Sequence, residues 1–430
     1  MGSERRRSRL KESGASRNRL GLGAWIVLAT VAPRPAAGGE WLAAGESPGH
    51  EQNVDPRVEY RPVVGAPRLV VPSESLPPEI QPGRSNNNVG IAMHDGRLFM
   101  AWRSSLVHFA SRGARLLVVS SPDQGESWDF ETEVALGADV REPFLVSFEG
   151  RLVLSFFEGG TNPLGFEPQQ MWRTVYEGPQ QWSELETWGE PGEVPWDFKV
   201  RGDRVWMTSY IGNHYGLLVP ELELRFQVSD DGWNFEPVAS EGPVVYLGGV
   251  SEASFEFDGD RRLWAVTRNE DGDRSGFGSH LAVAEPDDWG NWDFPEESDP
   301  KRYDSPRLFR HRDEIYMVAR RDILGPYDRG WDIFPLPMQR LIYLALYSLR
   351  PKLTALYRID RENRRVEHVQ NLPSAADTAF PSIIQTGPDD FLVANYTSPA
   401  SHLWKTWLFG QVSPWGTQIY LIPIAFEPVG

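Results

Sequence analysis

Six segments of this chain share one design, and this repeat limits the possible folds more than any other feature of the sequence. Each is an apolar stretch, a short polar turn and a second apolar stretch: NVGIAMHDGRLFMAWR, PFLVSFEGRLVLSFF, DFKVRGDRVWMTSY, ASFEFDGDRRLWAVTR, PRLFRHRDEIYMVAR and PSIIQTGPDDFLVANY. The returning stretches begin at Arg97, Arg151, Arg204, Arg262, Glu314 and Asp390. These positions are roughly 50–60 residues apart until the last interval, which is about twenty residues longer. Each unit also holds a third and often a fourth apolar stretch, which predicts an all-β fold: a six-bladed β-propeller of four-stranded antiparallel blades.

The residues before the first repeat have two expected roles. The segment APRLVVPS at 66–73 is spare, and we expect it to close the ring by pairing into the last blade of a propeller over 62–430. A basic stretch from Arg5 to Arg19 precedes the apolar run LGLGAWIVLATVA at 20–32, which suits a signal-peptide core better than a bilayer span. We therefore expect a signal peptide at 1–39, a linker at 40–61 and a secreted or periplasmic protein without an integral membrane span after processing. The alternative is a disordered basic tail with an apolar patch.

Composition excludes several classes of function. The formal net charge of −17 argues against nucleic acid or an anionic membrane surface as a partner, because both favour a basic surface. The chain has no P-loop, no dinucleotide fingerprint, no cysteine and no His-x-x-x-His pair, so neither a metal nor a cofactor is expected. Its 17 tryptophans suit either stacking on sugar rings or packing between sheets.

The stretch SPDQGESWDF at 121–130 has an acid, a glycine and an aromatic residue at spacings that suit a turn between strands. The Asp123 carboxylate can accept backbone N–H bonds, Gly125 can adopt a positive φ, and Trp128 can pin the turn onto the sheet. Weaker copies include DDGWNF at 230–235, where Val228 stands at the position of the serine. The motif therefore predicts a structural role.

Residues 121–128 resemble the Asp box (BNR repeat), Ser/Thr-x-Asp-x-Gly-x-x-Trp/Phe, of the sialidase-like (neuraminidase) superfamily, with Ser121, Asp123, Gly125 and Trp128 at the defining positions. The resemblance covers about 84–428 and implies a six-bladed propeller whose Asp boxes are structural and lie away from the substrate. It identifies the fold better than the reaction.

The hairpin repeat also predicts where the ligand site lies. The start of each innermost strand and the end of the next strand should lie at the same mouth of the propeller. Counting ten residues back from each returning start gives Asn87, Arg141, Val194, Glu252, Asp304 and Phe380, and counting six forward gives Arg103, Phe157, Tyr210, Arg268, Arg320 and Tyr396. Such a ring of charged and polar groups suits a polar ligand. The alternative is that these groups pair with one another around a water-filled channel.

Several arginines at one mouth suit a carboxylate, because guanidinium binds it bidentately and keeps its charge. The resemblance implies an arginine triad: Arg268 is similar to the second member, Arg307 or Arg320 to the third, and Arg141 lies in an Arg-Glu-Pro similar to the family's Arg-Ile-Pro, although in the second blade. The predicted substrate-binding residues are Arg141, Arg268, Arg307, Arg320, Arg103, Asn87, Tyr210 and Trp331. Trp331 belongs to the long segment 322–340, expected to be a lid or a sugar-stacking platform.

Two departures from the family concern the reaction itself. Phe380 stands where the resemblance implies the tyrosine nucleophile, and SSLVHFASRG at 104–113 lacks the aspartate acid. His108 is the titratable group there with an ordinary pKa near neutrality. Standard sialidase chemistry is therefore not expected.

The predicted catalytic residues are Glu252, Asp304 and Tyr396. Tyr396 could lean toward Glu252, or Glu252 and Asp304 could form a carboxylate pair that divides acid and base work, with Asp377 or Glu142 in reserve. The alternative is that Glu252 and Asp304 make salt bridges to Arg268 and Arg141.

The function predicted from these residues is a glycoside hydrolase, or a related glycan-cleaving enzyme, acting on an anionic sugar. The alternative is a non-catalytic carbohydrate-binding or protein-interaction propeller with a degenerate site.

Overall fold

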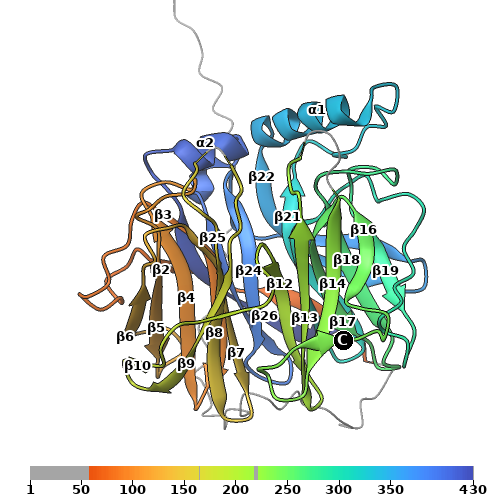
Figure 1. The fold of residues 1–430 in the computed structure, drawn as a ribbon. Helices are drawn as coiled ribbons and strands as arrows, with labels where there is room; N and C mark the ends of the chain where they lie inside the picture. Colours follow the sequence, from red (N-terminus) through yellow and green to blue (C-terminus); the bar gives the residue numbers. More distant parts are fainter. Residues whose placement is uncertain (1–57, 164, 217–220, 430) are drawn as a thin grey trace, which may run out of the picture. The chain divides into compact units, whose positions relative to one another are not determined.

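The computed structural model describes residues 58–163, 165–216 and 221–429, and the expected signal peptide and most of the expected linker lie outside these residues. Six antiparallel sheets stand around a common axis (Figure 1). The first three consist of β3 (Ser85–His94), β4 (Arg97–Ser105), β5 (Arg115–Ser121) and β6 (Asp129–Val134); β7 (Val140–Phe148), β8 (Arg151–Glu158), β9 (Met171–Gly178), β10 (Gln181–Trp182) and β11 (Glu186–Trp188); and β12 (Val194–Arg201), β13 (Arg204–Gly212), β14 (Leu222–Ser229), β15 (Glu236–Pro237) and β16 (Val244–Gly248).

The other three sheets follow in chain order, and the last includes the first strands of the chain. They consist of β17 (Val250–Phe257), β18 (Leu263–Asn269) and β19 (Leu281–Ala284); β20 (Asp304–His311), β21 (Glu314–Asp322), β22 (Lys352–Asp360) and β23 (Arg365–Asn371); and β24 (Thr378–Gln385), β25 (Asp390–Thr397), β26 (Gln418–Pro428), β1 (Tyr60–Val64) and β2 (Arg68–Val71). The predicted six-bladed β-propeller is confirmed.

Ring closure follows the prediction with one addition. β2, within the segment predicted to close the ring, pairs antiparallel with β26 of the last blade. β1 also pairs with β26 along its whole length and begins at Tyr60. Strands from both ends of the described chain therefore share the last blade, and this shared blade closes the ring.

The number of strands varies around the ring. The fourth sheet has three strands in the described chain, and an isolated bridge between Val283 and Asp293 takes the place of a longer fourth strand. The second, third and sixth sheets have five strands each. The inner hairpins on which the site depends are present in all six blades.

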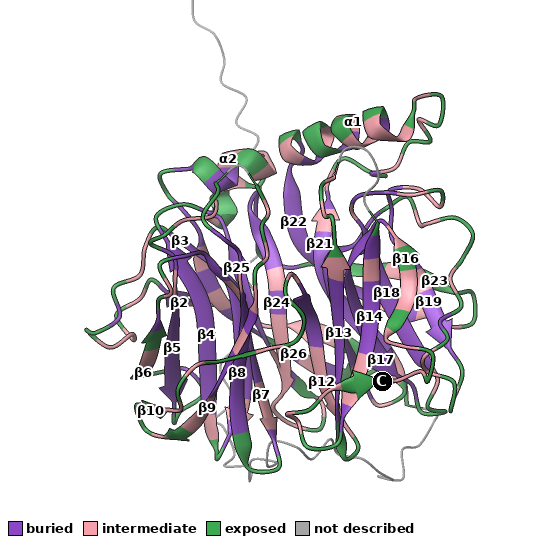
Figure 2. Cartoon of the chain, viewed as in Figure 1, coloured by how far each residue is buried: buried purple, intermediate pink, exposed green. Residues whose placement is uncertain are grey.

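Central strands are buried on both faces because each blade packs between two neighbours (Figure 2). In β4, every residue after Arg97 is buried, and Trp102 has no exposed surface. Trp102 and Trp128 belong to one apolar cluster that extends to Tyr396 of the last blade.

The turn at 121–128 has the geometry that its residue types suggest. The Ser121 hydroxyl donates to Asp123 over 2.8 Å, Gly125 has φ +86°, and Trp128 is 4% exposed. Hydrogen bonds, the largest from the Ser127 hydroxyl, lower the pKa of Asp123 to about 2. In the weaker copy the hydroxyl of Ser229 donates to Asp231, so the bonded pair lies one residue later than the pattern suggests.

Two helices lie at the mouth end of the strands, at the top of Figure 1. α1 (Leu336–Leu349) follows β21 and has proline in its first turn, where no N–H is needed; it ends before the extended Arg350, which precedes Pro351. α2 (Trp407–Val412) follows β25 and the short 3₁₀ turn η1 (Ala400–His402). No helix among the described residues is long and apolar enough to cross a membrane.

Candidate active site

The strand register brings the two predicted columns together. Asn87, Arg141, Val194, Glu252 and Asp304 are the Cα partners of Arg103, Phe157, Tyr210, Arg268 and Arg320. In the sixth blade a bulge shifts the register, so Tyr396 pairs with Ala379 and not with Phe380. The two columns therefore lie opposite each other in five blades, and the sixth blade is displaced by one residue.

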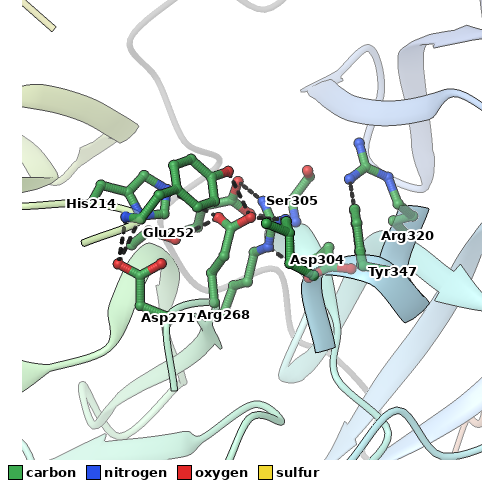
Figure 3. A network of polar contacts seen from close by, with 12 residues as sticks. His214, Glu252, Arg268, Asp271, Asp304, Ser305, Arg320 and Tyr347 are labelled. Carbon is green, nitrogen blue, oxygen red and sulfur yellow. Dashed lines mark hydrogen bonds and ion pairs between the residues drawn. The ribbon is translucent and has the colours of Figure 1, made fainter. Parts of the chain in front are cut away.

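Arg268 is surrounded by three carboxylates, of which Glu252 and Asp304 are labelled in Figure 3. Its Nη1 donates to Glu252 over 2.6 Å and its Nη2 to Glu270 over 2.5 Å, while its Nε lies 2.7 Å from an oxygen of Asp304. All four side chains are less than a tenth exposed. The guanidinium is thus occupied by groups of the protein itself, as in the channel-lining alternative.

Glu252 and Asp304 lie on neighbouring blades, and their surroundings move their pKa values in opposite directions. Burial raises the pKa of Glu252, partly offset by the charge of Arg268. Asp304 has a lowered pKa: burial opposes this shift, but the charges of Arg302 and Arg268 outweigh it. Both oxygens of Glu252 are engaged, because its second oxygen accepts the backbone N–H of Ser305 over 2.7 Å.

Glu142 is a carboxyl group whose pKa is strongly raised. It is half-buried at the bulge of β7, with φ +53°, and its buried Oε2 has no hydrogen-bond partner among the described residues. Burial, followed by the negative charge of Glu252, raises the pKa of Glu142 to about 8, against the opposing charges of Arg141, Arg307 and Arg268. Glu142 is therefore neutral at pH 7, and negative charge on Glu252 adds to the preference for its protonated form.

A second group of charges borders the Arg268 cluster. His214, in the loop after β13, lies 3.0 Å from Asp271 and 3.2 Å from Glu270. Although burial opposes protonation, the two carboxylates raise the pKa of His214 to about 10. The ring of Tyr215 stacks on His214 with centroids 3.8 Å apart. His214 is thus a buried cation that holds Glu270 against Arg268.

The arginines of the first two blades are engaged in the same manner. Arg103 donates to Asp139 over 2.7 Å, and Arg141 donates to the other oxygen of Asp139 over 2.5 Å and to the carbonyl of His108. Arg103 and Asn87 have no exposed surface. These residues stiffen the mouth between the blades and present little surface to a ligand.

Tyr396 is held within the sixth blade. Its hydroxyl donates to Asp377 over 3.0 Å, and the other oxygen of Asp377 lies 2.7 Å from Nδ1 of His108. Burial raises the pKa of Tyr396 well above its usual value. A fully buried, protonated phenol that donates to a carboxylate does not fit the role of a nucleophile. Burial also lowers the pKa of His108, so that imidazole is neutral near pH 7.

The remaining predicted residues mostly contact other protein groups. Arg320 donates to the carbonyl of Thr378 over 2.6 Å and to the hydroxyl of Tyr347. Arg307 lies 3.1 Å from Asp197 and packs over aromatic rings. Tyr210 is buried, and Trp331 stacks on Tyr343 of α1. The segment around Trp331 thus packs against α1.

A pocket of about 50 Å³ lies between the His214 loop, the Arg268 cluster and α1. Its lining includes Tyr215, Glu270, Arg302, Arg340, Leu341 and Leu344. Nη1 of Arg302 and Nη1 of Arg340 are both buried without a hydrogen-bond partner among the described residues. Arg302 is 3% exposed and packs over the rings of Tyr327 and Tyr347. Both arginines line the pocket, and their positive charge suits a small anionic group.

Sequence reasoning missed Arg302 and Arg340. Arg302 lies two residues before the column position of Asp304, and Arg340 lies on α1, at the end of the segment 322–340 that was expected to be a lid or a sugar-stacking platform. The Arg-Tyr-Asp order at 302–304 was a usable signal, because an arginine beside a strand start can reach the same mouth. Among the described residues, no group of three or more His, Asp or Glu side chains has a metal-binding arrangement.

Neither a protein-family model nor a curated protein sequence matches the chain, but many solved structures do. A protein of unknown function from Dyadobacter fermentans is 12% identical with a TM-score of 0.54, over 80% of this chain and 95% of that one. The phage phi92 endosialidase is 10% identical with a TM-score of 0.50, over 80% of this chain and 68% of that one. A Trypanosoma rangeli sialidase mutant displaying trans-sialidase activity is 10% identical with a TM-score of 0.47; this chain covers 54% of its length, about half.

The likeness is one of fold. This chain is a six-bladed β-propeller of the architecture that sialidases use. The site must be judged from its own residues.

Proposed function

We propose that this protein is a glycan-cleaving enzyme of the glycoside hydrolase class, with Glu142 as its general acid and Glu252, whose charge acts on Glu142, as its second carboxyl group. The observation that carries the proposal is Glu142, a carboxyl group with one unpartnered oxygen and a pKa of about 8. A group that keeps its proton at neutral pH can protonate a leaving oxygen, while a neighbour that has lost its proton supplies negative charge.

Arg268 has a positioning role in this arrangement. It binds Glu252, Glu270 and Asp304 at once and so fixes the carboxylates of two blades around the axis. Burial raises the pKa of Glu252 and the charge of Arg268 opposes this shift, while negative charge on Glu252 favours the protonated form of Glu142. The acid and base roles are thus coupled through one buried cation.

Arg302 and Arg340 supply the preference for an anionic sugar. Both arginines line the pocket together with Glu270, in place of the predicted Arg141, Arg268 and Arg320, which protein groups already occupy. A sugar carboxylate in this pocket would meet the positive charge of both arginines.

The test compares glycosides that differ in leaving group. On a panel of soluble sialosides and uronosides, Glu252→Gln should abolish turnover of every substrate. Glu142→Gln should slow alkyl glycosides strongly, by about a hundredfold or more, but spare aryl glycosides whose leaving group needs no proton. Glu177→Gln, at an exposed position of β9, is the matched control and should behave as wild type. Equal losses on both kinds of substrate with Glu142→Gln would remove the acid from the proposal.

A binding function is supported by a separate observation. Arg103, Arg141, Arg268 and Arg320 are all bound by groups of the protein, and Phe380 stands at the implied nucleophile position. If wild type and Glu252→Gln retain anionic glycans equally and release no product, the protein is a carbohydrate-binding propeller.

A further inference from the structure

The mouth face carries most of the large apolar side chains that the described chain exposes. They lie on the loops after β4, β21 and β25 and on the helices within the last two. Examples are Leu106 at 70% exposed, Leu341 at 54%, Leu344 at 48%, Trp404 at 69%, Val412 at 60% and Trp415 at 59%. We call these six residues the apolar rim. Figure 2 shows the outer faces of α1 and α2 exposed at the same end of the propeller.

α1 is apolar on both sides, which is unusual for a surface helix. Its inner side packs Tyr343 and Tyr347 against Phe277 and Tyr327. Its outer side presents Leu341 and Leu344, and its one charged residue, Arg340, turns inward to the carbonyls of Asp271 and Gly272. A helix of 14 residues is too short to span a bilayer but long enough to lie in its interface.

The charge of these loops differs from that of the whole chain. The net charge is −17, which taken alone argues against an anionic surface. On the loops after β4, β21 and β25, however, the exposed charged residues are Arg112, Arg329 and Lys405 against one acid, Asp332. Cations beside exposed tryptophan and leucine match the layered chemistry of a membrane surface, with anionic headgroups outside and acyl chains beneath.

We propose that the apolar rim docks on the surface of a lipid bilayer that contains anionic lipid. The rim side chains enter the headgroup and upper acyl region, and Arg112, Arg329 and Lys405 lie at the level of the headgroups. Because Leu341 and Leu344 also line the pocket, docking brings the pocket beside the lipid surface. Where the proposed function holds, the substrate class is then an anionic glycan attached to a lipid.

The experiment is co-sedimentation of the full chain with vesicles of phosphatidylcholine containing about a quarter phosphatidylglycerol. Binding should be weaker on pure phosphatidylcholine and should fall with added salt. Trp404→Ser with Trp415→Ser, and separately Leu341→Ser with Leu344→Ser, should each reduce the partition coefficient about tenfold or more. The matched control is Val244→Ser with Val369→Ser, at exposed positions on outer strands, and should bind as wild type.

Other outcomes overturn the proposal in distinguishable ways. No binding to either vesicle excludes the bilayer. Binding that both rim variants leave unchanged assigns it to another part of the chain, such as the apolar run at 20–32. A wild-type dimer that the rim variants convert to monomer, measured by sedimentation velocity, identifies a second copy of the chain as the occupant. Turnover of soluble glycans is measured separately, so failure of docking does not count against the proposed reaction.

Discussion

Replacing Glu142 by glutamine should make the protein more stable at neutral pH, which is the reverse of the usual effect of removing a buried polar group. The pKa of Glu142 is raised from 4.5 to about 8, because burial and the charge of Glu252 disfavour its ionised form. The contribution of such a group to stability is fully present below the unfolded pKa of 4.5 and is lost as pH rises through about 8. Glutamine has the same shape and no proton to lose, so it avoids this loss.

The size of the effect follows from the pKa difference. At pH 7 Glu142 keeps its proton in the folded protein and has lost it in the unfolded chain. Relative to low pH, this difference lowers the free energy of unfolding by about 1.4 kcal/mol for each pH unit above the unfolded pKa, or by roughly 3 kcal/mol. Because Glu142 is half-buried, solvent screens part of this cost, and a gain of about 2 kcal/mol is expected for Glu142→Gln at pH 7. The gain should be near zero at about pH 4.5 and constant above about pH 8.

The assay is equilibrium urea unfolding of wild type, Glu142→Gln and the exposed control Glu177→Gln, followed by tryptophan fluorescence across this pH range. The quantity of interest is the difference in unfolding free energy between variant and wild type, since changes in other groups cancel in it. A difference that does not change with pH, or that favours wild type above pH 7, would show that Glu142 is not a neutral buried acid. The proposed general acid would then be lost as well.

Three further predictions concern other parts of the structure. His214→Gln should destabilise the protein by roughly 3–4 kcal/mol at pH 7, because the stability from the raised pKa of about 10 is fully present below 6.5 and lost as pH rises through 10; an equal deficit at pH 7 and above pH 10 would contradict this. Arg340→Met should weaken binding of free glucuronate about tenfold in calorimetric titration, with no effect on glucose; unchanged glucuronate affinity would exclude Arg340 from the anion site. Gly90→Ala should lower the unfolding free energy by about 3 kcal/mol, because an added Cβ would lie 2.2 Å from the carbonyl oxygen of Pro143 in the next blade; a stability equal to wild type would show that the inner strands can move apart.

The fold could be predicted from the sequence because a propeller repeats its signal. Six hairpins with the same alternation of apolar stretch and polar turn specify the inner strands, and the turn position fixes their register. The pairs Glu252–Arg268 and Asp304–Arg320 follow from counting along these hairpins. Ring closure was also predictable, because one apolar segment remained without a partner.

The ionic state of the site could not be predicted from residue types. Whether Arg268 receives a substrate or three carboxylates depends on Glu270, which lies after the counted end of β18, and on His214 from another blade. Whether a carboxyl group is acid or base depends on the sum of burial and several charges. The sequence offered Glu252 with Asp304, whose pKa values do shift in opposite directions, but it could not show that the pKa of Glu142 is raised to about 8.

The bulges at the mouth explain why counting missed Glu142 and misplaced Phe380. Every inner strand changes register just after its start, and in four blades a residue with a left-handed backbone stands there: Asn88, Glu142, Ser305 and Phe380. A bulge inserts one residue that has no partner on the next strand, so counting passes over it, as at Glu142, or places it in a column in which it does not pair, as at Phe380. At Ser305 the inserted residue gives its N–H to Glu252, and at Glu142 it places an unpaired carboxyl oxygen in the interior. Holding a non-glycine residue in this conformation costs free energy, and such costs concentrate at functional sites. The residues that repeat counting passes over are therefore those in which we expect the chemistry of this propeller to reside.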